Sequence, residues 1–368
     1  MLTAHFDYVL PADLIAQEPA EPRDAARLLV AARDGGPAVH AQVRDLPRYL
    51  ERGDLLVLNR TRVIPARLFG RKDSGGELEV LLVHPEPAGE DQVAGEGPAL
   101  AHAWRCIIRG RVRAGTVIRF AGTPAVATVL ACYEDGTRSV AFSGMEVLAL
   151  ADAIGHVPLP PYIRRPDRSA DRERYQTVFA DRPGSVAAPT ASLHFTPELL
   201  VEIQARGVTL AYVDLAIGPG TFKPVDCDRL EDFRIHAEHC CCPTETVAAV
   251  AACRARAGRV VAAGTTVVRT LESAAAQEGG FATYAGWTTL FLHPPQTVRV
   301  VDALLTNFHL PRSSLLMLVS CLTGIERLHA LYAEAIQERY RFFSYGDAML
   351  LLPGAGLSGH GRGPSLAP

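Results

Sequence analysis

Four residues carry side chains that can transfer protons and stand in irregular segments of the chain: His194, His236, Glu238 and His309. A positioned histidine or carboxylate can act as a general base, as a general acid, or as both in turn. His236 and Glu238 stand two residues apart, which favours an acid–base pair. Ordinary structural roles are the alternatives. His194 can be a hydrogen-bonded histidine near a helix start, and His309 can belong to a turn that packs Phe308 into the core.

The cysteine run Cys240–Cys242 suggests a metal site, but the pattern is incomplete. Zinc sites combine one pair of ligands spaced about two to four residues apart with a second such pair. His236, His239 and these cysteines supply the first pair, whereas Cys227 and Cys253 stand alone. We therefore expect no metal here.

A glycine turn at Gly264-Thr265-Thr266 separates a predicted strand, Arg259–Ala263, from a predicted helix, Thr266–Gln277. The N-terminus of a helix presents free N–H groups and the positive end of its dipole, so it binds carboxylates and phosphates. Either threonine can cap the helix or bind a ligand, and Arg269 and Glu272 share one helix face. An ordinary capped turn is the alternative, because the segment lacks the G-x-G-x-x-G pattern.

A second turn contains Gly218, Gly220 and Thr221 and follows the predicted strand Val208–Ile217. Two glycines at the end of a strand let a ligand approach the backbone closely. A plain tight turn explains them equally well.

Three aromatic residues follow an arginine close to the C-terminus and offer stacking surfaces. Asn307 and His309 flank another aromatic residue, Phe308, and can present polar groups beside its stacking surface. Such combinations can stack a base or an adenine, although a core strand over Phe342–Leu352 is the plainer explanation. The C-terminal residues are Arg341, Phe342, Phe343 and Tyr345.

The helices and strands that must position these residues are of two kinds, which indicates two kinds of domain. Helices and strands alternate after residue 145, which is typical of an α/β fold. Short β-rich runs with Gly, Asp and Pro between them fill residues 70–144 and indicate a small barrel or sandwich. We expect an α/β main domain (1–69 and 145–352), an inserted all-β, barrel-like domain (70–144) and a disordered tail (353–368). Further strands are predicted over Thr288–Leu292 and Val298–Leu305.

The composition is that of an ordinary globular protein. Of the 368 residues, 48% are hydrophobic and 21% charged, and the net charge is −3, which argues against a generic polybasic nucleic-acid binder. No apolar run reaches the roughly 18 residues of a membrane span, and no secretory signal opens the chain. We therefore expect a cytoplasmic protein without a disulfide framework, despite its eight cysteines.

Basic residues nevertheless gather locally. Arg105, Arg109, Arg111 and Arg113 surround Trp104 in the β-rich segment. They can follow a phosphate backbone. A solvated charged face is the alternative, and it is favoured by the general use of Arg in place of Lys along this chain.

Taken together, these segments resemble one family, the S-adenosylmethionine:tRNA ribosyltransferase-isomerases, which build the queuosine side chain on tRNA. The resemblance runs from about Phe6 to Leu352. The segments that carry it are Phe6–Pro11, Leu14–Gln17, Gly53–Asn59, Thr61–Leu68, His156–Ile163, Arg174–Phe179, Val186–Phe195, Gly264–Ser273, Val301–Pro311 and Tyr340–Met349.

The resemblance implies an activity and its substrates. The family transfers and isomerises the ribosyl part of S-adenosylmethionine onto 7-aminomethyl-7-deazaguanine at the wobble position of tRNA. The product is epoxyqueuosine in tRNA, and adenine and methionine are released. S-adenosylmethionine is then a substrate, and no metal or redox cofactor is implied. We expect a monomer that binds this tRNA and no membrane.

On this interpretation the four proton-transferring residues line the site, and the methionine carboxylate binds at the Gly264 turn with help from Arg269. Phe342, Phe343 or Tyr345 stacks the adenine or the deazaguanine, and the Arg105–Arg113 strip is the tRNA platform. The other substrate-binding residues expected are Asn59, Thr61, Arg62, Arg67, Thr190, Gly218, Gly220, Thr221, Thr265, Thr266, Glu272 and Asn307.

The chain departs from the family pattern at four positions: Arg60, Ser192, Ala216 and Pro219. The family tends to have a small polar residue, a glycine and a histidine at the first three. Two alternatives therefore stay open, a divergent paralogue that uses S-adenosylmethionine on another acceptor and a non-catalytic tRNA-binding relic.

Overall fold

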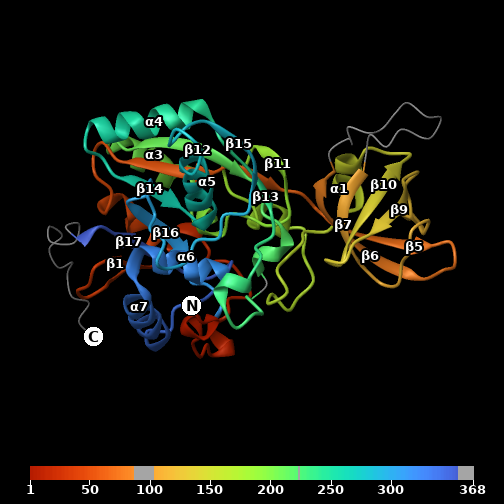
Figure 1. The fold of residues 1–368 in the computed structure, drawn as a ribbon, viewed down its shortest axis with the longest axis horizontal. Helices are drawn as coiled ribbons and strands as arrows, with labels where there is room; N and C mark the ends of the chain where they lie inside the picture. The colour runs from red at the N-terminus through yellow and green to blue at the C-terminus, as the bar shows by residue number, and fades with distance from the viewer. Residues whose placement is uncertain (87–102, 223, 355–368) are drawn as a thin grey trace.

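The computed structural model describes residues 1–86, 103–222 and 224–354. It consists of a large main body and a smaller barrel joined to one side of it (Figure 1). The fold class expected from the sequence, an α/β body with an inserted all-β barrel, is confirmed. Most of the tail predicted to be disordered lies outside the described residues.

A nine-stranded mixed sheet forms the centre of the main body. Its neighbouring strands β12, β3, β14 and β16 run parallel, so their carboxyl ends meet at one edge, where α/β proteins bind ligands. In spatial order the strands are β15 (Tyr284–Thr288), β13 (Glu238–Cys242), β12 (Thr209–Leu215), β3 (Leu55–Asn59), β14 (Val260–Ala263), β16 (Ala303–Asn307), β17 (Ala348–Leu352), β1 (Arg27–Ala32) and β2 (Val39–Gln42).

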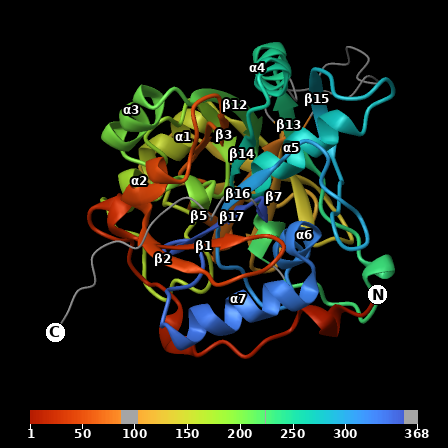
Figure 2. The ribbon, with the colours of Figure 1, turned by 90° about the vertical axis from the view of Figure 1, so that its left-hand side faces the viewer.

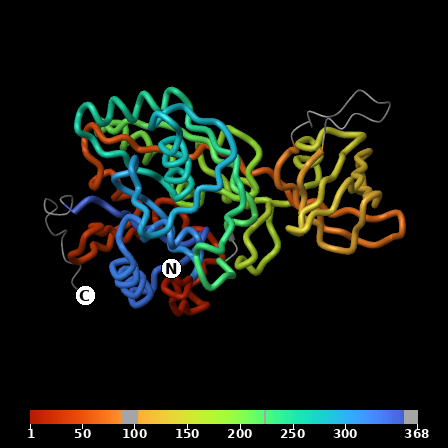
Figure 3. The backbone as a smooth tube through the Cα atoms, viewed as in Figure 1, coloured from red at the N-terminus to blue at the C-terminus, as the bar shows by residue number. Residues whose placement is uncertain are grey.

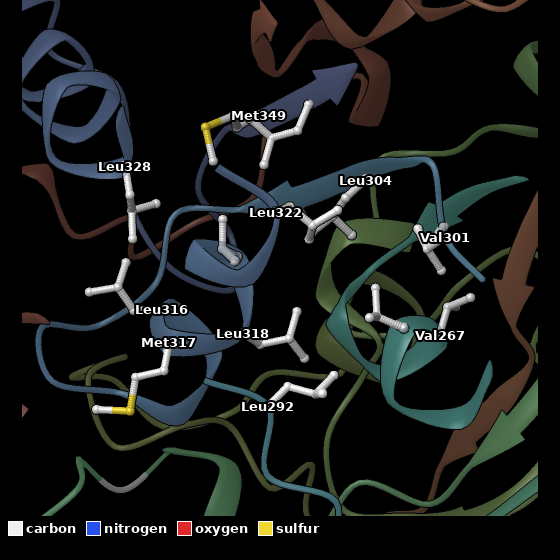
Figure 4. Packing of buried hydrophobic residues seen from close by; sticks show 14 of the residues in the cluster. Val267, Leu292, Val301, Leu304, Leu316, Met317, Leu318, Leu322, Leu328 and Met349 are labelled. Atoms are coloured by element: carbon white, nitrogen blue, oxygen red, sulfur yellow. The ribbon is translucent and has the colours of Figure 1, made fainter. Parts of the chain in front are cut away.

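Helices cover both faces of this sheet (Figure 2). Leu55 and Val57 of β3 pack into a cluster with α4 (Thr244–Ala255), α5 (Thr265–Ala275), α6 (Ser314–Thr323) and α7 (Ile325–Gln337). The alternate residues Leu56 and Leu58 face α3 (Pro197–Ala205) instead. Side chains from β16, α5 and α6 interdigitate in the larger cluster (Figure 4). Each fully buried aliphatic side chain contributes about 1.5–3 kcal/mol.

The barrel is closed and antiparallel, and alternate residues such as Leu78, Val80 and Leu82 fill it. Helix α1 (Val147–Ile154) packs on the same cluster through Val147 and Leu150. The barrel strands are β5 (Arg67–Lys72), β6 (Glu77–Pro85), β7 (Ala103–Arg109), β8 (Val117–Arg119), β9 (Val126–Cys132) and β10 (Thr137–Ser143).

The chain passes between body and barrel twice (Figure 3). The short parallel strands β4 (Thr61–Val63) and β11 (Arg182–Ser185) pair at this junction, near the short helix α2 (Asp171–Arg174). The predicted domain limits at residues 70 and 144 stay a prediction. The packing of β5 and α1 with the barrel favours limits outside them.

Two strand predictions are wrong because side chains take the backbone groups that a ladder needs. The Thr288 hydroxyl accepts the Leu290 N–H, so the chain turns away where a strand over Thr288–Leu292 was expected, and β15 precedes it. The Glu272 carboxylate accepts the Arg299 and Val300 N–H groups, so β16 starts only at Ala303 rather than at Val298.

The strand predicted over Phe342–Leu352 also begins late. Asp347 accepts the N–H of Arg341, and the Gly346 N–H donates to Phe343 O at 2.9 Å, which closes a tight turn over the first half. Only Ala348–Leu352 joins the sheet, as β17. Strands β1 and β2 were not predicted.

Among the described residues, no single helix is long and apolar enough to cross a membrane. The successive helices α6 and α7 pass that test only when taken together, with a bend of 112° between them.

Candidate functional site

A pocket lies at the carboxyl edge of the parallel strands; we call it the deep pocket. Its polar lining comes from segments far apart in the sequence, which include the start of α5, the loop after β12, the end of β16 and the turn before β17. The lining residues are Tyr162, Ala187–Ala191, Ile217, Thr221, Gly264–Thr266, Thr306, His309, Leu310, Ser313, Leu315, Phe343 and Ser344.

The start of α5 forms one wall of the deep pocket for a local backbone reason. Gly264 has φ +103°, which favours glycine over any residue with a side chain. This conformation turns the chain from β14 directly into α5, and the first N–H groups of a helix have no partner within it. The Thr266 hydroxyl accepts a hydrogen bond from Asn59 Nδ2 at 3.2 Å, so this wall is tied to the end of β3.

Phe343 supplies an aromatic wall and is held in an unusual conformation. Its φ is +72°, which costs about 1–3 kcal/mol in a residue other than glycine. Asn307 Nδ2 donates to the Phe343 carbonyl at 3.1 Å, and the Phe343 N–H donates to Phe308 O. The ring lies 4.7 Å from that of Tyr162. The strained turn thus places one aromatic side chain in the pocket.

Glu238 fixes the loop that borders the deep pocket. Its Oε1 accepts the Gly218 N–H at 2.9 Å and the Thr221 hydroxyl at 3.0 Å, while its Oε2 is paired with Arg269. Both charged side chains are buried, at 6% and 5% exposure. Arg269 Nε also donates to Leu290 O at 3.2 Å. The pair therefore holds the loop Gly218–Thr221 against helix α5.

The other side of this loop faces the cleft between body and barrel. One cavity there, which we call the cleft cavity, has a volume of about 390 Å³ and receives both body and barrel residues. A second cavity continues the cleft past Pro219, with Arg67, Arg109 and Arg165 in its lining. The lining of the cleft cavity is Val83, His84, Arg105, Ile107, Asp135, Thr137, Gly218–Gly220, His236–Glu238 and Trp287.

The four predicted proton-transferring residues are separated by this arrangement. His309 lines the deep pocket, whereas His236 and Glu238 line the cleft cavity. His194 is buried outside the deep-pocket lining, with Nε2 3.5 Å from Asn307 Nδ2. Gly220 makes room for His236, because a Cβ at position 220 would lie 2.5 Å from the imidazole.

Burial keeps two of these histidines neutral. It lowers the pKa of His309 to about 3 and that of His194 to about 4. His309 Nε2 lies 2.8 Å from the Thr306 hydroxyl, and the His309 N–H donates to Tyr332. At neutral pH the deep pocket therefore contains an uncharged imidazole that is hydrogen-bonded to Thr306, on a residue whose backbone N–H is held by Tyr332.

Six predicted substrate-binding residues do meet in the deep pocket: Thr190, Thr221, Gly264, Thr265, Thr266 and Phe343. Gly218 and Gly220 line the cleft cavity, Arg67 the continuation of the cleft, and Arg62 a separate cavity near α2.

The remaining predicted residues are engaged in internal contacts. Asn59 bonds both the N–H and the carbonyl of Leu215, and its Oδ1 also accepts the Thr61 N–H. Glu272 holds the backbone before β16, and burial raises its pKa. Phe342 is fully buried in the core. The structure brings none of these side chains into the deep-pocket lining.

Tyr345 and Thr61 are likewise internal. The Tyr345 hydroxyl donates to Asp171 Oδ1 at 3.0 Å, and Asp171 also forms an ion pair with Arg165 at 2.6 Å. The Thr61 hydroxyl donates to Arg182 O at 3.5 Å. These contacts hold the proline-rich segment and the β4–β11 junction in place.

The four predicted tRNA-binding arginines lie in two separate parts of the barrel, two in each. Arg105 and Arg109 face the cleft but are neutralised by Glu86 at 3.0 Å and Glu79 at 3.4 Å, respectively. Arg111 and Arg113 are exposed beside Lys72, at another part of the barrel. Within the described residues, neither Arg111 nor Arg113 forms an ion pair.

Several lining residues were not predicted individually. Tyr162, Thr306 and Ser344 lie inside segments that carry the resemblance, so a signal existed but could not select the side chain that faces the pocket. Trp287 and His84 gave no signal, because only the folded chain brings the barrel and β15 together.

The four departures from the family pattern fit the fold without strain. Arg60 pairs with Asp214 at 3.0 Å, and this hydrogen bond raises the pKa of Arg60. The Ser192 hydroxyl lies 3.5 Å from the Ala263 carbonyl. The Ala216 N–H joins the β12–β13 pairing, and Pro219 lies in the cleft.

In the part of the chain that the structure describes, no group of three or more His, Cys, Asp and Glu side chains is arranged to hold a metal ion.

The Glu238–Arg269 pair predicts a large stability effect. Glu238→Gln leaves a buried guanidinium without its counter-charge, which should lower the free energy of unfolding by about 3 kcal/mol. Glu202→Gln is the control, because its pair with Arg206 is exposed at 52% and 44% and should contribute about 0.5 kcal/mol or less. Urea unfolding measures both. Equal losses in the two variants would contradict the assignment.

His309 predicts a pH effect. Its folded pKa of about 3 lies below the unfolded value of about 6.5, so the unfolded chain takes up the proton first. Stability is therefore complete above pH ~6.5 and falls as the pH approaches the folded pKa.

The matching measurement is urea unfolding of the wild type and of His309→Gln at two pH values. Between pH 6.5 and 4.5 the wild type should lose about 2–3 kcal/mol more than the variant. Losses of the same size in both proteins would show that His309 is not buried in its neutral form.

Comparisons with known proteins show the family of this chain. Residues 3–351 match the family described as "Queuosine biosynthesis protein". The chain is 51% identical over 355 residues to the S-adenosylmethionine:tRNA ribosyltransferase-isomerase of Anaeromyxobacter sp., covering 95% of this chain and 99% of the relative. It is 50% identical over 358 residues to that of Gloeobacter violaceus, covering 96% and 97%.

A solved structure is similar as well. The S-adenosylmethionine tRNA ribosyltransferase from Thermotoga maritima is 38% identical, with a TM-score of 0.53 over 95% of this chain and 100% of that one. The match along nearly all of this chain, and the curated relatives at about half identity, lead to one conclusion: the chain belongs to the queuosine biosynthesis protein family.

Proposed function

We propose that this protein transfers and isomerises the ribosyl part of S-adenosylmethionine onto 7-aminomethyl-7-deazaguanine at the tRNA wobble position. The observation that carries the proposal is the loop Gly218–Thr221, which separates the deep pocket from the cleft that body and barrel line together. A transfer from a small molecule to an RNA base needs two binding regions that adjoin, so that the acceptor amine can reach the ribosyl part past this loop. The names of the relatives support the same reaction.

The deep pocket presents groups that match S-adenosylmethionine, although its free volume of about 60 Å³ holds only part of that molecule. The free N–H groups at the start of α5, with the hydroxyls of Thr265 and Thr266, can receive the methionine carboxylate. Arg269 does not serve this purpose directly, because its guanidinium is paired with Glu238. Phe343 offers a ring face to the adenine.

The chemistry asks for a base that is unprotonated at neutral pH. A sulfonium acidifies the protons on its neighbouring C5′ carbon, so a positioned group can remove one of them and begin the reaction. Among the four predicted residues, only His309 combines a neutral imidazole with a place in the deep pocket. We therefore propose His309 as the group nearest the ribosyl part. His194 and Glu238 are positioning residues: His194 contacts Asn307, and Glu238 holds the loop Gly218–Thr221.

The acceptor enters from the cleft. Enzymes that modify a base inside a folded RNA turn it out of its stack, and the cleft offers polar walls on both sides. Within this proposal the enzyme acts as a cytoplasmic monomer and uses no metal or redox cofactor.

Incubation with S-adenosylmethionine and tRNA carrying the aminomethyl-deazaguanine tests the reaction. Free adenine, free methionine and the mass of the modified nucleoside are measured. We expect equal release of adenine and methionine together with an epoxy-cyclopentanediol gain on the nucleoside. Adenine release without that nucleoside would instead indicate a paralogue with another acceptor. Absence of turnover by folded protein that binds tRNA would indicate a relic.

Arg111 and Arg113, which form no ion pair within the described part of the chain, predict the salt dependence of tRNA binding. Arg111→Ala with Arg113→Ala should weaken binding to all tRNAs and lower the slope of log K against log salt by about 1–2. Arg44→Ala is the control; it changes an arginine beside β2, on the body. Its slope should match that of the wild type. An unchanged slope in the double variant would exclude this barrel surface from the RNA contact.

A further inference from the structure

Trp287 is a large aromatic side chain left open to the cleft. The residue is 45% exposed. It lies on β15, the strand at one edge of the nine-stranded sheet. Figure 1 shows β13 and β15 on the side of the body toward the barrel. An exposed tryptophan in a cavity that two domains share is a feature that neither the deep pocket nor the core packing explains.

Two imidazoles fix the indole edge-on. His239, its cross-strand partner on β13, has its ring centroid 5.6 Å away at an interplanar angle of 82°. His84, on barrel strand β6, lies 4.8 Å away at 65°. Both contacts are of the T-shaped kind, so they hold the ring without stacking on it.

The surroundings define the ligand chemistry. The cleft cavity, about 390 Å³, adds Arg105, Asp135, His236 and Glu238 to the indole, and this volume lies within the range of small-molecule sites. One flat aromatic surface with donors and acceptors around it matches a planar ring that carries polar edges. A nucleobase has this shape and can hydrogen-bond to polar walls, which an aliphatic chain cannot.

We propose that Trp287 stacks on a base of the RNA substrate that has left its own stack in the cleft cavity. The inference rests on the proposed function, since it takes RNA as the substrate. Stacking on an aromatic side chain is the usual way in which proteins hold unpaired bases. The site lies across the loop Gly218–Thr221 from the deep pocket, so it holds RNA without touching S-adenosylmethionine.

The chain contains only two tryptophans, which makes the test direct. Trp104 is buried inside the barrel at 7% exposure, so Trp104→Phe leaves Trp287 as the only tryptophan, whose emission can be excited selectively over that of the ten tyrosines. Titration with an RNA hairpin carrying the aminomethyl-deazaguanine in its loop should quench this emission. The quenching should saturate with the affinity measured independently by anisotropy. Hairpins with single abasic positions then identify the base, because one of them should lose the quenching.

Variants separate stacking from a structural role. Trp287→Ala should weaken hairpin binding roughly tenfold to a hundredfold, whereas Trp287→Phe should retain most of the affinity. Phe69→Ala removes an aromatic residue of 52% exposure elsewhere on the barrel and should bind as the wild type does. Thermal stabilisation by S-adenosylmethionine should be equal in all four proteins, which shows that the deep pocket is intact.

Two outcomes would overturn the proposal. One is an unchanged Trp287 emission at saturating RNA, and the other is a Trp287→Ala affinity within twofold of the wild type, as expected if the indole only joins barrel and body. Failure of the ribosyl transfer is distinguishable from both. Wild-type protein that quenches with RNA but releases no adenine retains the stacking site and loses the proposed reaction.

Discussion

The buried ion pair between Glu238 and Arg269 is the interaction on which the candidate site depends. Burying two charges is costly unless hydrogen bonds satisfy them, and here the carboxylate also accepts the Gly218 N–H and the Thr221 hydroxyl. The pair therefore converts an otherwise loose glycine-containing loop into a fixed wall. One side of this wall belongs to the deep pocket, and the other belongs to the cleft.

Backbone constraints complete the deep pocket. The positive φ of Gly264 directs α5 toward the pocket, and the positive φ of Phe343 directs an aromatic ring into it. Asn59 and Asn307 hold these two turns through side-chain hydrogen bonds. These asparagines are thus positioning residues, buried at 0% and 2% exposure. Such strain persists only where the surroundings enforce it.

The electrostatics of the two compartments differ in a way that suits their proposed ligands. The deep pocket contains a neutral imidazole and the uncompensated N–H groups of a helix start, so it can receive a zwitterionic, cationic sulfonium compound without a fixed positive side chain. The barrel presents Arg111 and Arg113 without ion pairs among the described residues, which suits a polyanion. The cleft lies between these regions and joins them.

Local patterns predicted most of the elements but only part of the site. Turn residues and short apolar runs predicted the barrel, and the Gly264 turn predicted the start of α5. Arg269 was expected to bind a ligand, and it instead pairs with Glu238, 31 residues earlier, because only the adjacency of β13 and α5 brings them together. The strands before Ala303 and Ala348 were misplaced for a related reason. Glu272 and Asp347 take the backbone N–H groups there, and nothing in the hydrophobic pattern records that.

The most direct test of two compartments divided by one wall is a structure of the protein with both substrates bound. S-adenosylmethionine and an anticodon hairpin carrying the aminomethyl-deazaguanine would be used, trapped in a variant such as His309→Gln. We predict the sulfonium compound between the start of α5 and Phe343 and the RNA in the cleft, with its acceptor base reaching past the loop Gly218–Thr221 to the ribosyl part. RNA bound outside the cleft would contradict this arrangement.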